Sequence, residues 1–154
     1  MQIRRLFLSN RNRRLLYAIT NTCMNYGIRT TLSCSFEDAV EKTKKALASE
    51  GFGILTEVDV QATLKKKMDV DIQKYLILGT CNPPFAYEAL QAEKEIGLLL
   101  PCNIIIYETD GHVIVSAIKP SVAMNMVENT ELAEVASLVE EKMKLPAPEG
   151  RGIS

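Results

Sequence analysis

The 154-residue sequence has no tryptophan, a single histidine and no apolar run of the length that a membrane-spanning helix needs. A helical span takes about 20 mostly apolar residues, so we expect no membrane partner. The composition, 47% hydrophobic and 24% charged, is ordinary for a globular protein and argues against a disordered or fibrous chain. At this length we expect one domain with one sizeable core.

Motifs that identify a reaction are also missing. The sequence contains no GxGxxG, GxxxxGK[ST], HExxH or GxSxG pattern. The single histidine, His112, follows an Asp-Gly turn and has no acidic partner placed by spacing. Glu57 and Asp59 lie two apart, which is typical of one solvated strand face. The sequence therefore predicts no catalytic residue and leaves any cofactor open.

The four cysteines do not form a metal-binding or disulfide pattern. Cys23, Cys34, Cys81 and Cys102 are widely spaced, and no two make a CxxC pair. A structural zinc site needs four ligands, usually at close spacing, so we expect no metal. A chain of this size with few cysteines indicates reduced thiols in the cytoplasm.

Acidic residues are absent from the first 35 positions, which carry six arginines. Residues 36–154 hold 12 Lys and Arg against 19 Asp and Glu, a net charge of −7. Nucleic-acid binding needs clustered cations to neutralise phosphates, so the acidic body predicts no nucleic-acid partner.

Residues 1–23 differ from the rest and are expected to be a basic extension outside the fold. Three interpretations remain open: a natural start at Met24, a targeting segment, or a basic arm for nucleic acid or an acidic partner. Residues 24–145 then form the single domain, and residues 146–154 form a flexible tail.

After Met24 the sequence alternates between patterns typical of strands and of amphipathic helices. We expect strands over residues 26–32, 52–60, 74–80, 103–107 and 112–118, and helices from Ser35 to Gly51, from Pro84 to about Gly97 and from Thr130 to about Lys144. One face of the second strand should carry Phe52, Ile54, Thr56, Val58 and Val60. One or two helical turns and a loop should fill residues 61–73.

The order of these elements, β-α-β-β-α-β-β-α, predicts an α+β fold with an antiparallel sheet of about five strands and helices packed on one face. Asp110-Gly111 lies between two apolar alternating runs and indicates a tight hairpin. The third and fourth predicted strands should then be antiparallel neighbours.

Four sequence strings resemble the bacterial and archaeal family called domain of unknown function 302. They are Phe52-Gly-Ile-Leu-Thr-Glu-Val-Asp59, Ala62-Thr-Leu64, Ile77-Leu-Gly-Thr-Cys-Asn-Pro83 and Gly97-Leu-Leu-Leu-Pro-Cys-Asn103. The resemblance covers roughly residues 24–145. It implies a TATA-binding-protein-like α+β architecture and a homodimer, and it implies no established activity.

Two Cys-Asn steps beside prolines mark the candidate site. Cys81 ends the third predicted strand and Cys102 opens the fourth, so antiparallel pairing would bring them within about 10 Å, without a disulfide. Prolines fix loop shape and Asn side chains can bind a ligand or the backbone. The candidate ligand-binding residues are Cys81, Asn82, Pro83, Pro84, Pro101, Cys102, Asn103 and Thr63, the last beside the basic run Lys65–Lys67.

Three functions fit this pattern. The first is a homodimeric binding module with a small-ligand site at these strand ends. The second is a thiol-dependent redox or metal-handling protein that uses Cys81 and Cys102. The third is a structural subunit that acts only through its dimer surface. Buried packing of both cysteines is the simplest alternative to a thiol site.

Overall fold

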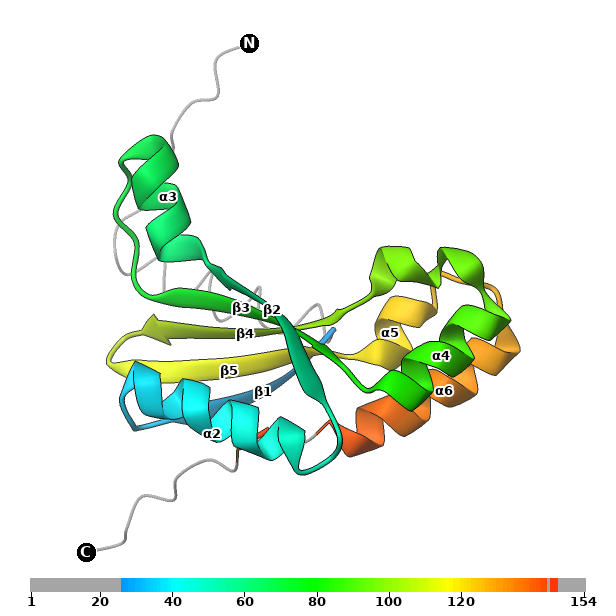
Figure 1. Cartoon of the computed structure of the whole chain (residues 1–154). Helices are drawn as coiled ribbons and strands as arrows, with labels where there is room; N and C mark the ends of the chain where they lie inside the picture. The colour runs from blue at the N-terminus through cyan, green and yellow to red at the C-terminus, as the bar shows by residue number, and fades with distance from the viewer. Residues whose placement is uncertain (1–25, 144, 147–154) are drawn as a thin grey trace, which may run out of the picture.

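Five antiparallel strands and the helices between them make up the computed structural model, which describes residues 26–143 and 145–146 (Figure 1). The elements are β1 (Gly27–Leu32), α2 (Phe36–Ala48), β2 (Gly53–Asp59), α3 (Val60–Met68), β3 (Tyr75–Cys81), α4 (Pro83–Ala92), the 3-10 helix η1 (Lys94–Leu99), β4 (Cys102–Thr109), β5 (His112–Ile118), α5 (Pro120–Met124) and α6 (Thr130–Lys142). The strands form one sheet in the order β1-β5-β4-β3-β2. The predicted fold class and element order are confirmed.

The residues that flank the helix α2 determine where it begins and ends. The Ser35 hydroxyl accepts a hydrogen bond from the backbone N–H of Asp38 (3.1 Å), which caps the first turn. Ala39, Thr43 and Leu47 lie one turn apart and are buried against the sheet. Past the end of the helix, Gly51 has a φ of +83°, a conformation that glycine adopts at little cost.

The main core lies between one face of the sheet and the helices. Alternation along β3, β4 and β5 turns Leu78, Ile104, Ile106 and Val115 to this face, where all four are fully buried. The buried side chains of α2 and the second half of α6 pack against them, Val139 among them. The sheet is thus covered on one face, as the sequence predicts.

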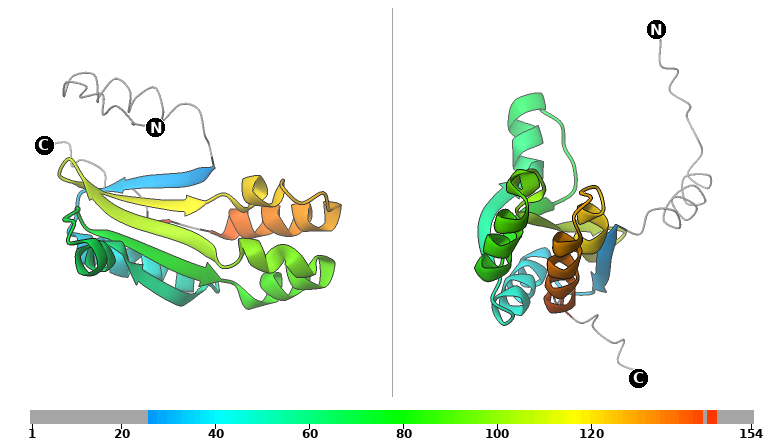
Figure 2. Two further views of the ribbon diagram at one scale, coloured as in Figure 1. Left: turned by 90° about the horizontal axis from the view of Figure 1, so that it is seen from above. Right: turned by 90° about the vertical axis from the view of Figure 1, so that its right-hand side faces the viewer.

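The helices α4, η1, α5 and α6 gather beyond one end of the strands (Figures 1 and 2). Their own small core comprises Ala89, Ile96, Met124, Leu132 and Ala136. Ser121 at the start of α5 donates a hydrogen bond from its backbone N–H to a Glu140 carboxylate oxygen (3.1 Å), which ties α5 to α6. This group of helices borders two cavities at the strand ends that carry Cys81 and Cys102.

The second strand differs from its predicted form. A bulge between Ile54 and Thr56 adds one residue, so Ile54 faces the core while Thr56 and Val58 face the opposite side. Val60 does not continue the strand but begins α3. The expectation of one shared face from Phe52 to Val60 is therefore wrong, because an alternation pattern does not reveal an inserted residue.

The helix predicted from Pro84 to Gly97 is divided in two. It ends at Ala92, because Glu93 adopts an extended conformation (φ −152°), and η1 follows. The Glu93 carboxylate accepts a hydrogen bond from the backbone N–H of Glu95 (3.1 Å) and so caps the second segment. The chain reverses direction here and returns to β4.

The helix α3 projects from the far end of the sheet (Figure 1). None of its nine residues is buried. Nine residues are also fewer than an isolated helix needs to be stable in water. Asp59 caps its first turn by accepting from the N–H of Ala62 (2.8 Å), and Lys65 pairs with Asp69 (2.8 Å). These local bonds and the adjoining β2 and β3 hold it in place.

Other sequence-based expectations have mixed outcomes. The Asp110-Gly111 hairpin is confirmed, with positive φ at both residues, and β3 and β4 are antiparallel neighbours. The expectations for residues 1–23 and 147–154 lie outside the described residues. No helix in the described part of the chain is long and apolar enough to cross a membrane.

Candidate functional site

The two Cys-Asn steps meet at one end of the sheet. The partner of Cys102 in the β3–β4 register is Thr80, the residue before Cys81. Paired Cα atoms lie about 5 Å apart and successive Cα atoms 3.8 Å apart, so the two cysteine Cα atoms are within about 10 Å. The expected proximity is confirmed, and both residues are free thiols in the structure.

The predicted site residues are divided between the two faces of the sheet. Cys102 and its partner Thr80 face the core and are buried. Asn103, the next residue of β4, points to the opposite face and is exposed. The strand ends thus contribute to two separate cavities rather than to one site.

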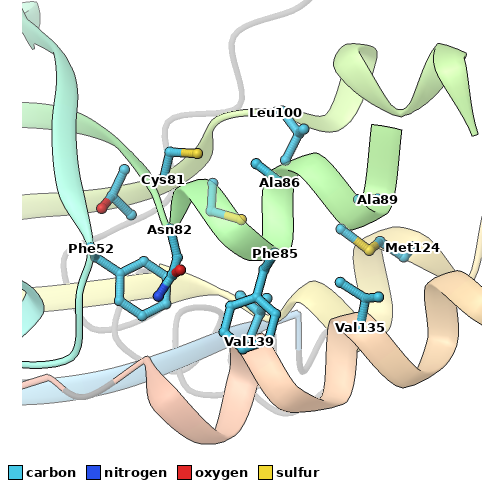
Figure 3. A pocket seen from close by; sticks show the side chains of 12 residues that line it. Phe52, Cys81, Asn82, Phe85, Ala86, Ala89, Leu100, Met124, Val135 and Val139 are labelled. Atoms are coloured by element: carbon cyan, nitrogen blue, oxygen red, sulfur yellow. The ribbon is translucent and has the colours of Figure 1, made fainter. Parts of the chain in front are cut away.

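The cavity on the core side is small and apolar. It lies between the helices α4, α5 and α6 and the adjoining ends of the strands (Figure 3). Its volume of about 20 Å³ holds one water molecule at most, whereas ligand pockets span about 300–1,000 Å³. Its lining residues are Phe52, Thr80, Cys81, Asn82, Phe85, Ala86, Ala89, Leu100, Cys102, Met124, Val135 and Val139.

Both thiols beside this cavity are in their neutral form at physiological pH. Burial raises the pKa of Cys102 to about 11, with a further contribution from the neighbouring Cys81. Burial also raises the pKa of Cys81. The thiolate is the nucleophile and the metal ligand, so this environment works against both kinds of chemistry.

Asn82 and the two prolines after it build a structural junction. The Asn82 side-chain amide donates to the backbone carbonyl of Glu50 (3.2 Å), which ties the start of α4 to the loop after α2. Pro83 and Pro84 occupy the first turn of α4, where the missing N–H groups need no helical partner. The Cys-Asn-Pro-Pro step therefore fixes the chain path between sheet and helix.

The cavity on the opposite face is an open apolar groove between η1, the start of β4 and α5. Its volume is about 520 Å³, within the range of small-molecule sites. Leu98 and Met126 at its rim are 82% and 72% exposed, which is high for large apolar side chains. The lining residues are Tyr26, Leu98, Leu99, Leu100, Pro101, Asn103, Ile118, Val122, Ala123 and Met126.

Sequence reasoning named Pro101 and Asn103 at this groove and missed its apolar walls. Among the described lining residues, Asn103 supplies the one side-chain amide, and no hydrogen bond to another described residue occupies it. The run of three leucines, Leu98–Leu100, was a sequence signal for these walls. When three apolar residues follow one another directly before a strand, some of them remain exposed. The contribution of α5 comes from tertiary packing alone.

Thr63 lies away from the other candidates. It belongs to α3, at the opposite end of β3 from Cys81, and its hydroxyl donates to the backbone carbonyl of Asp59 (2.6 Å). In the neighbouring basic run, Lys65 pairs with Asp69 and Asp71. Among residues 26–143 and 145–146, no group of His, Cys, Asp and Glu side chains is arranged to hold a metal ion.

Gly79 permits the close packing of Pro101 at the edge of the groove. A Cβ atom at Gly79 would overlap Thr56 Oγ1 and lie 2.8 Å from Pro101 Cγ. We expect Gly79→Ala to lower the free energy of unfolding by about 1–3 kcal/mol, because the added methyl overpacks a buried position. Urea denaturation measures the change. Gly97→Ala is the control, since nothing lies within 4 Å of its Cβ position; equal stability of the two variants would contradict this packing.

Comparison with known proteins identifies the family. A family model described as Domain of unknown function DUF302 matches residues 28–145, and the chain belongs to this family. The structure is similar to the crystal structure of an uncharacterized conserved DUF302 protein from Bacillus stearothermophilus, with a TM-score of 0.74 and 26% sequence identity. The match covers 78% of this chain and 94% of that chain. No curated protein matches the sequence.

Proposed function

We propose that this domain is a binding module whose ligand site is the apolar groove at the Pro101-Cys102-Asn103 strand end. The observation that supports the proposal is the groove itself, with a volume suited to a small molecule and large apolar side chains exposed at its rim. Exposed apolar surface is unfavourable in water, so a ligand that covers this surface lowers the free energy of the system.

The lining residues define the chemistry of the ligand. Leu98, Val122 and Met126 offer aliphatic and thioether surface, which suits an apolar group of mixed shape. Asn103 can both donate and accept a hydrogen bond and would orient one polar group of the ligand. None of the described residues that line the groove is charged, so the proposed ligand is an uncharged or weakly polar molecule with an apolar body.

A hydrophobic dye and a native mass spectrum test the ligand site. We expect the purified protein to bind anilinonaphthalene sulfonate while folded, and Leu98→Gln to weaken that binding several-fold. Leu138→Gln on α6 is the control, because Leu138 is also exposed but lies outside the groove. A native mass spectrum of the untreated protein should show a bound mass that Leu98→Gln reduces. Equal dye binding by both variants would overturn the proposal.

We further propose that the protein is a cytoplasmic homodimer. The family resemblance implies the dimer, and the free thiols Cys34, Cys81 and Cys102 are in keeping with a reducing compartment. Sedimentation equilibrium of the full chain measures the oligomeric state, and a monomer at every concentration would exclude the dimer.

The second candidate function, thiol-dependent redox or metal chemistry, depends on the proximity of Cys81 to Cys102. The raised pKa values of both thiols make this function the weaker proposal. In a titration of native protein with Ellman's reagent, we expect Cys102 to react at least two orders of magnitude more slowly than it does in the unfolded chain. This follows from its scarce thiolate and its burial. Fast reaction of both thiols in the native state would favour the redox function instead.

We propose that the folding unit is residues 24–145 and that residues 1–23 contribute little core. The segment is rich in arginine and lacks acids, and the family match begins at residue 28. Deleting residues 1–23 should therefore leave the melting temperature nearly unchanged in calorimetry. A drop of many degrees would show that the segment belongs to the folded domain.

A further inference from the structure

The groove and the small cavity on the core side are neighbours that share one side chain. Leu100 lines both, and among the described lining residues it is the one common to the two cavities. Figure 3 shows the Leu100 side chain on the core side, next to Ala86 of α4. Leu100 therefore separates the groove of about 520 Å³ from the core-side cavity of about 20 Å³.

The backbone around Leu100 explains this position. Leu100 follows η1 and precedes Pro101, and its backbone is extended, with φ −112° and ψ 150°. A residue before proline favours this conformation for steric reasons. The chain then enters β4, where Cys102 lines the core-side cavity and Asn103 lines the groove. The two cavities thus meet where the chain enters the sheet.

The helix α5 forms the rest of the partition. Its Met124 lines the core-side cavity, whereas Val122 and Ala123 line the groove. The backbone N–H of Ser121 donates to a Glu140 carboxylate oxygen, which holds α5 against α6. With α5 held in this way, Leu100 is the side chain whose shortening would join the two cavities.

The groove becomes less exposed toward Leu100. Leu98 at the rim is 82% exposed, whereas Leu100 is half-buried. Between them the walls are aliphatic, and Asn103 supplies an amide at an exposed position. A molecule with a polar end at Asn103 and an aliphatic chain directed toward Leu100 would satisfy both parts of the groove.

We propose that the ligand of the groove is a neutral amphiphile with one unbranched aliphatic chain, and that Leu100 limits the length of chain that the site accepts. This inference rests on the proposed ligand site and names its ligand class. The match in charge supports this occupant: no described residue that lines either cavity is charged, and burying a charge without a partner is costly.

The proposal predicts how affinity depends on chain length. Each buried methylene group contributes about 0.8 kcal/mol, which corresponds to about a fourfold change in Kd. Affinity should therefore rise with each methylene until the end of the chain reaches Leu100. Longer chains have no further apolar space to enter, so their affinity should level off.

Displacement of anilinonaphthalene sulfonate from the full-length protein by 1-alkanols, from hexanol to undecanol, measures this dependence. Leu100→Ala removes three carbon atoms from the partition and opens the groove to the core-side cavity. In this variant the rise should continue for at least about two further methylenes, a gain of about 15-fold before affinity levels off. The position of the plateau is informative even if the shorter wall weakens binding of every alkanol.

Leu99→Ala is the matched control. Leu99 is also a half-buried leucine that lines the groove and packs against the same small helical core, but it does not line the core-side cavity. Its truncation widens the groove equally without opening the partition. Affinity should therefore level off at the same chain length as in the unsubstituted protein.

Circular dichroism establishes that each variant is folded, and Leu100→Val decides the question if Leu100→Ala does not fold. Valine suits an extended backbone and is shorter by one methylene, so the plateau should move by about one methylene. A folded Leu100 variant with the same plateau as Leu99→Ala would overturn the role of Leu100. If no alkanol displaces the dye, the ligand class is overturned. The groove itself fails only if Leu98→Gln leaves dye binding unchanged, so the two failures are distinguishable.

Discussion

Replacing Ile104 by alanine is expected to lower the free energy of unfolding by about 2–5 kcal/mol, the largest effect of any single substitution considered for this protein. Ile104 is fully buried on the central strand, in the cluster where the sheet packs against α2 and α6. The substitution removes buried methyl and methylene groups and leaves a cavity that close-packed neighbours fill poorly. Chemical denaturation followed by circular dichroism measures the loss.

Leu138→Ala is the control for this prediction. Leu138 is 46% exposed on α6, so truncating it removes little buried surface and should cost less than about 1 kcal/mol. Both variants should be compared at one protein concentration, because association contributes to the apparent stability. An Ile104→Ala variant as stable as Leu138→Ala would show that the sheet does not pack as described.

Alkaline pH is expected to destabilise the fold through Cys102. Its pKa in the unfolded chain is near 9 and burial raises it to about 11 in the folded state. Between these values the unfolded chain binds fewer protons than the folded one, so stability falls as pH rises from about 9 to 11. The contribution is fully present below pH 9, and its loss amounts to about 3 kcal/mol. Cys81, whose pKa is also raised, acts in the same direction.

The Cys102→Ala variant separates this effect from the titration of lysines and tyrosines, because the variant and the unsubstituted protein carry the same lysines and tyrosines. Denaturation midpoints across this pH range should fall more steeply for the unsubstituted protein than for the variant. Parallel curves would mean that the Cys102 thiol ionises as readily in the folded state as in the unfolded chain. That result would favour thiol chemistry at this strand end.

The sequence by itself determined the elements whose signals are local. Ser35 marked the start of α2, and Asp110-Gly111 marked the hairpin between β4 and β5. The alternation of apolar residues located five strands, and the hairpin order made β3 and β4 neighbours. That neighbour relation brought Cys81 near Cys102 as expected. These features depend on capping, turn geometry and residue periodicity, all of which act over a few residues.

Tertiary structure decided where the candidate site residues face. Alternation along one strand turns Cys102 to the core and Asn103 to the groove, so adjacent residues of the Pro-Cys-Asn step belong to different cavities. The bulge at Ile54, the break at Glu93 and the placement of α5 beside η1 depend on packing between distant segments. Without them the walls of the groove cannot be located. Non-local packing has no fixed spacing in the sequence, which is why these features required the folded chain.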